Sequence, residues 1–173
     1  NGTHLEDFSG EYDSSKNILY LKAKTIESRI TLVTALSFKF TEGEIENIKV
    51  ENKEKAIYLL IDPKAEAEKI TLERNMIVYS SNDLENPLES ALNDAALALK
   101  SGYKKLKERH QVVWNKKWEL MDIKIKGNLL DQLAVRFNLY HNIIAAPAHS
   151  ERLPIGARGL SCQAYQGAAF WDQ

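Results

Sequence analysis

The hydrophobic pattern of this 173-residue chain changes once, at Asn86-Pro87. Before that point, apolar and polar residues alternate in short runs, as they do in strands that bury one face. After it, apolar residues recur every three or four positions, which is the pattern of an amphipathic helix. Asn-Pro is itself a helix start, with Asn as the N-cap and Pro at the first helical position. The chain is therefore predicted to form a β region followed by helices.

The β region covers residues 1–84, where apolar runs alternate with polar turns. The predicted strands occupy residues 18–23, 30–36 with 37–40, 45–50, 56–61, 70–72 and 76–79. Asp62-Pro63 should end one of them, because proline cannot donate to a β-ladder. About six strands at this spacing suggest a sandwich but are few for a closed two-sheet fold. The region is therefore predicted to be part of a β-sandwich.

The helical region is predicted to begin with one continuous helix from Pro87 to about Trp118. Its apolar stripe consists of Leu88, Leu92, Ala95, Leu99, Tyr103, Leu106, His110 and Val113. A short extended stretch at residues 122–127 leads to a second helix from Leu129 to about Ala145. From residue 149 onward, glycine and proline prevent any long regular element.

Composition excludes several classes of protein. Apolar residues make up 44 %, charged residues 27 %, and the net charge is −1, so nothing indicates a nucleic-acid partner. No apolar run approaches the roughly 18 residues of a membrane span. The one cysteine, Cys162, excludes an internal disulfide and suits a reducing, cytoplasmic compartment. We expect no metal site, because paired cysteines are absent and His141 and His149 are far apart with few carboxylates nearby.

The segment from residue 149 to 173 has the composition of a ligand-binding loop, with glycines placed among planar and polar side chains. Sugars need such a combination, since an aromatic ring covers the C–H face of a pyranose and a carboxylate or amide binds its hydroxyls. The candidate substrate-binding residues are Arg158, Tyr165, Phe170, Trp171 and Asp172. By composition alone, a buried loop with a core tryptophan and a capping aspartate is the simpler interpretation.

A series of residues in this region resembles glycoside hydrolase family 65. The series comprises the run 154–161, Tyr165, Gly167 and Phe170-Trp171-Asp172, preceded by His110, Trp114, Trp118, Ile123, Ile125, Gly127, Asp131 or Gln132, and the run 136–140. The resemblance is specific over residues 110–173 and weaker over the β region. It implies an α+β multidomain fragment: the end of an N-terminal β-sandwich (1–84), a helical linker (85–125) and the start of an (α/α)6 catalytic barrel (126–173). Both ends of the chain would then lie inside larger domains.

The resemblance also implies a chemistry. The family includes maltose, trehalose, kojibiose and nigerose phosphorylases, with some α-glucosidases and trehalases, and its members invert the anomeric carbon. One Glu protonates the leaving oxygen while phosphate, or an activated water in the hydrolases, attacks from the other face. Trp171 would border the glucosyl unit and Asp172 would accept hydrogen bonds from its hydroxyls, whereas Arg158 and Tyr165 could equally brace the loop.

No catalytic residue is expected within the chain, because the family's general acid lies beyond Gln173, and the isolated chain is expected to be inactive. The leading interpretation is part of an inverting α-glucosyl disaccharide phosphorylase that uses inorganic phosphate, needs no cofactor and releases glucose 1-phosphate. For the full-length protein, a homodimer is one expected assembly. A hydrolase of the same family and a non-catalytic carbohydrate-binding module remain alternatives. The runs 162–164 and 168–169 depart from the family's usual residues, which leaves the substrate linkage open.

Overall fold

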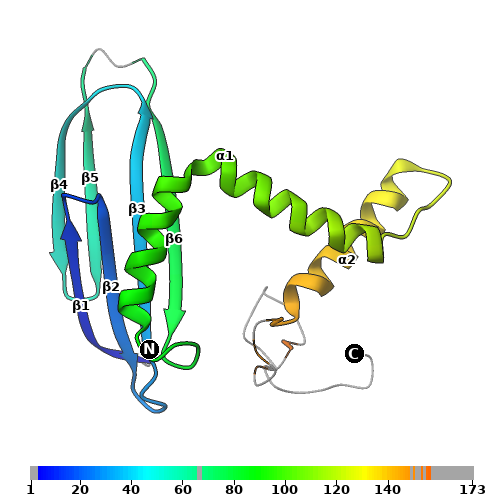
Figure 1. Cartoon of the computed structure of the whole chain (residues 1–173), viewed down its shortest axis with the longest axis horizontal. Coiled ribbons are helices and arrows are strands. Elements are labelled where there is room, and N and C mark those ends of the chain that lie inside the picture. Colours follow the sequence, from blue (N-terminus) through cyan, green and yellow to red (C-terminus); the bar gives the residue numbers. More distant parts are fainter. Residues whose placement is uncertain (1–3, 66–67, 149, 151–152, 154, 157–173) are drawn as a thin grey trace. The chain divides into compact units, whose positions relative to one another are not determined.

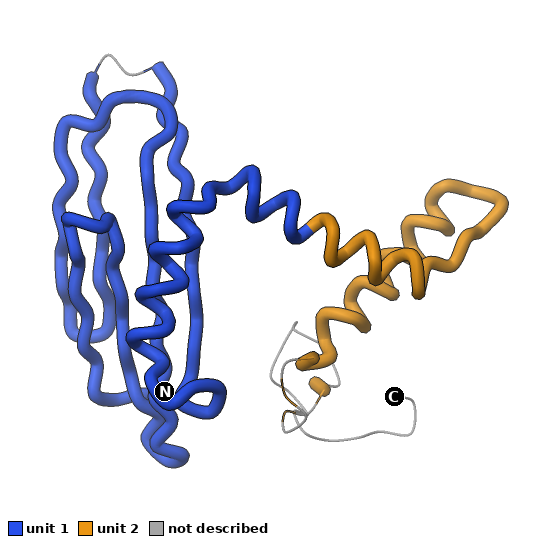
Figure 2. The backbone as a smooth tube through the Cα atoms, viewed as in Figure 1, with its two compact units in different colours: residues 1–110 blue, residues 111–173 orange. Residues whose placement is uncertain are grey.

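The computed structural model describes residues 4–65, 68–148, 150, 153 and 155–156. The described strands are β1 (Leu5–Asp13), β2 (Ile18–Thr25), β3 (Thr31–Glu42), β4 (Ile45–Lys53), β5 (Ala56–Pro63) and β6 (Thr71–Ser80), and the helices are α1 (Pro87–Met121) and α2 (Leu129–Ala145) (Figure 1). The chain divides into two compact units, Asn1–His110 and Gln111–Gln173, which Figure 2 colours separately. The first unit holds every described strand and the first part of α1.

The strands of the first unit form two antiparallel sheets. One is four-stranded, in the order β1-β2-β3-β6, and the other consists of β4 and β5 alone. The hairpin of β4 and β5 lies between β3 and β6 in sequence, so the chain leaves the larger sheet and returns to it. Two sheets followed by helices agree with the predicted α+β class and with a partial sandwich, whereas the (α/α)6 barrel stays a prediction.

The sequence did not predict β1. Its residues, LEDFSGEYD, are rich in acidic side chains and contain no β-branched residue, so local propensity does not favour a strand. The strand forms because it pairs with β2 from Leu5 to Asp13, with an irregularity between Glu6 and Ser9. Gly10 is needed within this pairing, because a Cβ there would lie 2.7 Å from the Tyr20 carbonyl oxygen. Tertiary pairing therefore decides this element.

One part of the core of the first unit lies between one face of the larger sheet and the first part of α1, and another part, which includes Leu19 and Phe38, lies on the opposite face. Side chains alternate along a strand, and Val33 and Ala35 of β3 point to the helix side with Ile18 of β2. They meet Ala91 and Ala95 of α1, and all five are almost completely buried. The small alanine side chains let the helix backbone come close to the sheet, and Leu88 and Leu92 of the same helix pack around them.

A polar contact also joins α1 to the sheet. The Tyr79 hydroxyl of β6 donates to a carboxylate oxygen of Asp94, with 2.5 Å between the two oxygens. This hydrogen bond, followed by burial, raises the pKa of Tyr79. The contact fixes the rotation of the helix about its axis, which the alanine contacts alone leave free to slip.

The prediction of one continuous helix up to Trp118 is wrong in one respect. The helix begins at Pro87 as predicted, but Gly102 has φ 77° and ψ 156°, so α1 consists of two helical segments joined at a kink. Figure 1 shows the bend. Beyond it the predicted apolar stripe is no longer covered: Tyr103 is 62 % exposed and Val113 54 %. The stripe therefore serves as a buried face only in the first segment.

Candidate functional site

The five residues predicted to bind a sugar, Arg158, Tyr165, Phe170, Trp171 and Asp172, all lie outside the described residues. The structure does describe the segment that leads to them, from the second part of α1 through residues 122–128 to α2. The second helix extends from Leu129 to Ala145, as predicted. How this segment is held decides where the binding loop begins.

Arg136 of α2 binds Asp122 at the end of α1 with both ends of its guanidinium group. Its Nε lies 2.8 Å from Oδ1 and its Nη2 lies 2.6 Å from Oδ2. Such a two-point pair fixes orientation as well as distance. The hydrogen bond from Arg136 is the main cause that lowers the pKa of Asp122. Because the folded-state pKa lies below its ordinary value, the pair stabilises the fold above that value and is lost as the pH falls through the folded-state pKa.

Gln132 holds the same connection through the backbone. Its Nε2 donates to the Ile123 carbonyl and its Oε1 accepts from the Ile125 N–H, each over 2.8 Å. The amide thus imitates the pairing of a neighbouring strand along residues 123–125. Asn128 caps α2 by accepting from the Leu130 N–H at 3.0 Å. The first turns of α2 are therefore bound both to residues 123–125 before the helix and to its own cap, Asn128.

Replacing Gln132 by alanine removes both backbone hydrogen bonds, and we expect unfolding of the second unit to require about 1–2 kcal/mol less free energy. Urea denaturation followed by tryptophan fluorescence measures this, because all three tryptophans of the chain lie in the second unit. Gln111→Ala, at an exposed position of α1, is the matched control and should change little. Equal stability of the two variants would show that Gln132 does not hold the connection.

The second unit also contains a cluster of aromatic rings. Trp114 and Trp118, one helical turn apart on α1, have ring centroids 6.0 Å apart. Trp114 also lies 5.1 Å from the ring of Tyr140, and the Lys117 ammonium lies 5.0 Å from the Trp114 ring centroid. These rings contact one another and so join α1 to α2 within the unit.

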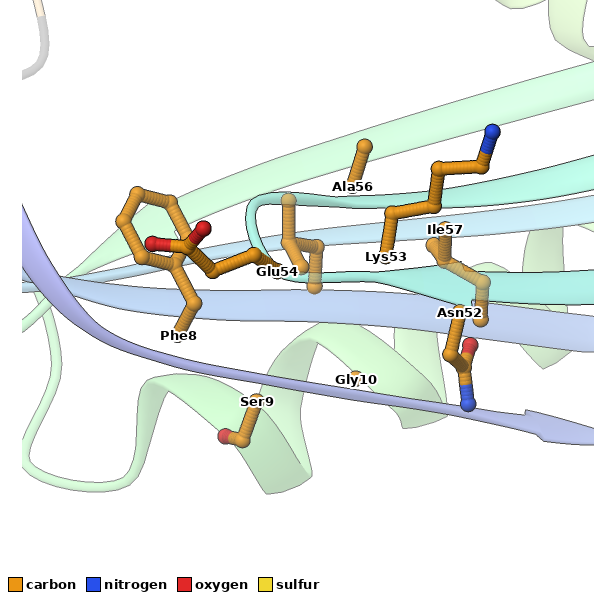
Figure 3. A pocket seen from close by; sticks show the side chains of 9 residues that line it. Phe8, Ser9, Gly10, Asn52, Lys53, Glu54, Ala56 and Ile57 are labelled. Carbon is orange, nitrogen blue, oxygen red and sulfur yellow. The ribbon is translucent and has the colours of Figure 1, made fainter.

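The surface of the first unit has two hollows that a ligand could enter. One, of about 250 Å³, lies between β1 and the turn after β4, and Figure 3 shows its side chains. Phe8 provides a ring there, and Ser9, Asn52 and Glu54 provide polar groups, the types of residue that bind sugars. All three polar residues are exposed, however, and water already solvates them. This hollow is a surface feature without an enclosed binding surface.

The other hollow, of about 370 Å³, lies between β1, β2 and α1. Two of the charged groups in its lining already bind each other. Asp13 pairs with Lys16 at 2.9 Å, and hydrogen bonds from Ser15 and then Lys16 lower the pKa of Asp13 to about 2. Burial first, and then the charge and hydrogen bond of Glu11, raise the pKa of Tyr20. Two carboxylates, Glu11 and Asp13, line this second hollow, but Asp13 is already paired with Lys16.

Two features are absent from the described residues. No group of three or more His, Cys, Asp or Glu side chains among them could hold a metal ion. Neither α1 nor α2, as far as they are described, has an apolar stretch long enough to cross a membrane.

Comparison with protein families gives two matches along the chain. Residues 1–117 match the domain described as "Glycosyl hydrolase family 65, N-terminal domain". Residues 136–173 match the "Glycosyl hydrolase family 65 central catalytic domain". The second match begins at Arg136, the residue that anchors α2 to Asp122, and contains all five predicted sugar-binding residues. The connection described above thus lies between the two matched domains.

Curated relatives agree with these matches. A 1,2-alpha-glucosylglycerol phosphorylase of Bacillus selenitireducens is 41 % identical over 100 % of this chain and 22 % of its own length. A kojibiose phosphorylase of Halothermothrix orenii is 33 % identical over 88 % of the chain and 21 % of its own length. A nigerose phosphorylase of Lachnoclostridium phytofermentans is 36 % identical over 89 % of the chain and 20 % of its own length.

The chain spans about a fifth of the length of these relatives. The strands and most of α1 belong to the part matched to the N-terminal domain. Most of α2 belongs to the part matched to the catalytic domain. On the length and order of these matches, the chain belongs to glycosyl hydrolase family 65.

Proposed function

We propose that this chain is part of an inverting α-glucosyl phosphorylase, and that it comprises the end of the N-terminal domain and the beginning of the catalytic one. The observation that carries the proposal is that three relatives matching 88–100 % of the chain are all named as phosphorylases, of 1,2-alpha-glucosylglycerol, kojibiose and nigerose. The predicted sugar-binding loop lies within the part matched to the catalytic domain. The proposed substrates are an α-glucoside, such as a disaccharide, and inorganic phosphate.

In the proposed reaction, a phosphate oxygen forms a bond to C1 of the glucosyl unit while the bond from C1 to the glycosidic oxygen breaks. A carboxylic acid elsewhere in the longer protein gives its proton to the leaving oxygen. Attack from the opposite face inverts C1, so an α-glucoside yields β-glucose 1-phosphate and a free alcohol. Within this chain, Trp171 borders the ring and Asp172 accepts hydrogen bonds from its hydroxyls, which positions C1 for the attack.

The full-length protein provides the test of this reaction. It should convert one or more of 1,2-α-glucosylglycerol, kojibiose, nigerose, maltose and trehalose to glucose 1-phosphate only when phosphate is present, and NMR should identify the β anomer. Release of free glucose at the same rate without phosphate would instead assign the protein to the hydrolases. Binding of these sugars without any turnover would favour the non-catalytic module.

The isolated 173-residue chain should show no turnover on these sugars, with or without phosphate, because the proposed proton donor lies outside it. The same assay measures this, with the full-length protein as the positive control. Turnover by the isolated chain would place the complete catalytic machinery within residues 1–173 and contradict the proposed division of roles.

A further inference from the structure

The kink in α1 arises at one residue whose backbone only glycine adopts readily. Gly102 has φ 77° and ψ 156°, a region that other residues enter only at considerable cost. A Cβ at this position would lie 3.5 Å from Lys39 Nζ, an ordinary contact, so lack of space is not the reason for the glycine. In an unbroken helix, the Leu99 carbonyl would accept from the Tyr103 N–H four residues later. The kink separates these two groups.

Each of the two separated groups finds a partner on the sheet. Lys39 Nζ, from β3, donates to the Leu99 carbonyl over 3.4 Å. The Tyr103 N–H faces the Glu73 carboxylate of β6 and contributes to the lowered pKa of that carboxylate. A cation thus lies at the carboxyl end of the first helical segment and an anion at the amino end of the second, which is the arrangement that the helix dipoles favour.

Lys39 and Glu73 also bind each other. They face each other directly in the register of β3 and β6, and Lys39 Nζ lies 3.1 Å from Glu73 Oε2. The Glu73 side chain is only 10 % exposed. Burial raises its pKa, but the hydrogen bonds from Lys39, the Tyr103 N–H and Asn75 outweigh burial, and the pKa is lowered overall. The pair is thus a partly buried unit that contacts backbone, unlike an exposed pair of the kind that contributes little.

We propose that Lys39 and Glu73 are positioning residues that replace the helix hydrogen bond lost at Gly102 and so hold the kink of α1 in one fixed geometry. The kink is then a built-in change of direction rather than a flexible hinge. It lies in the helix that leads from the sheet toward the residues matched to the catalytic domain. The proposal concerns the helix itself and does not depend on the reaction that the protein catalyses.

Residue-resolved hydrogen exchange of the full-length protein tests the proposal at the Tyr103 amide. In Lys39→Met/Glu73→Leu, which removes both charges together, this amide should exchange about 10- to 100-fold faster, because it loses a hydrogen bond to a charged acceptor. Lys49→Met/Glu51→Leu is the matched control. It removes the exposed pair of β4, whose charges lie 2.8 Å apart, and should leave Tyr103 unchanged.

Conservative variants separate positioning from a general loss of packing. Lys39→Arg keeps a donor for the Leu99 carbonyl and should retain wild-type protection of Tyr103, whereas Glu73→Leu alone should lose it. If the double variant does not fold, these single variants still decide the matter. Unchanged protection of Tyr103 in the double variant or in Glu73→Leu would overturn the proposal.

Gly102→Ala tests whether the kink needs a glycine at this position. An alanine cannot keep this backbone conformation without strain, so Tyr103 should lose its protection or the kink should straighten, with a lower melting temperature in either case. Gly127→Ala is the matched control, because its Cβ would lie 3.9 Å from the Ile125 side chain and its backbone is not left-handed. Equal melting temperatures and equal Tyr103 protection in the two variants would show that the glycine is not required.

Discussion

Replacing Phe38 by alanine should reduce the free energy of unfolding of the first unit by about 3–5 kcal/mol. Phe38 is 1 % exposed, on the face of β3 that points away from α1. Its ring stacks on Tyr12 and meets Phe40 edge-on, each with 6.1 Å between centroids. Removing the ring leaves a cavity in the middle of the sheet face, which backbone held in a β-ladder cannot collapse to fill.

Urea denaturation followed by circular dichroism in the β-sheet region measures this loss. Phe38→Leu, which fills most of the space, should cost only about 1 kcal/mol. Met76→Ala on β6, where the side chain is 63 % exposed, should change stability by less than about 0.5 kcal/mol. A Phe38→Ala variant no less stable than Met76→Ala would mean that this face of the sheet does not carry a core.

Replacing Asp172 by asparagine in the full-length protein should lower kcat/KM for the proposed α-glucoside substrate by about 10²- to 10⁴-fold. The proposed carboxylate accepts two hydroxyl hydrogen bonds, and each charge-assisted bond contributes about 1.5–3 kcal/mol. Losing these two hydrogen bonds costs about 3–6 kcal/mol of transition-state stabilisation. Each 1.4 kcal/mol lowers kcat/KM by a factor of about ten. Asparagine keeps the size of the side chain, so the effect isolates the charge.

Steady-state kinetics with a saturating phosphate concentration measure this change. Asp131→Asn is the control, because it makes the same substitution at an exposed position in the first turn of α2. It should leave kcat/KM within about threefold of the wild type, since its charge acts only on the helix end. If Asp172→Asn behaves like Asp131→Asn, Asp172 does not bind the glucosyl unit.

The elements that the sequence predicts well are those whose hydrophobic period is strong and whose ends carry local signals. Pro87 begins α1 as the Asn-Pro pair predicts, and α2 begins after its Asn128 cap and ends before Pro147. Here local chemistry and tertiary packing favour the same structure.

The features that sequence reasoning missed depend on residues far away in the chain. An isolated glycine is often tolerated within a helix, so nothing local marks Gly102 as a kink. Its partners, Lys39 and Glu73, lie on two different strands. Similarly, the resemblance includes Arg136 and either Asp131 or Gln132. It does not predict that Arg136 binds Asp122, or that Gln132 binds the backbone of residues 123 and 125. The five sugar-binding residues stay a prediction from the resemblance.

The close packing of Ala91 and Ala95 on the larger sheet has a practical consequence for dividing the protein. A truncation that stops after the last strand removes half of the core and leaves Val33, Ala35 and Ile18 facing solvent. Such a product should be prone to aggregation, because an apolar sheet face without its cover associates with other chains. A soluble version of the first unit should therefore keep the chain to the kink at Gly102, so that the helix is expressed with the sheet as one folding unit.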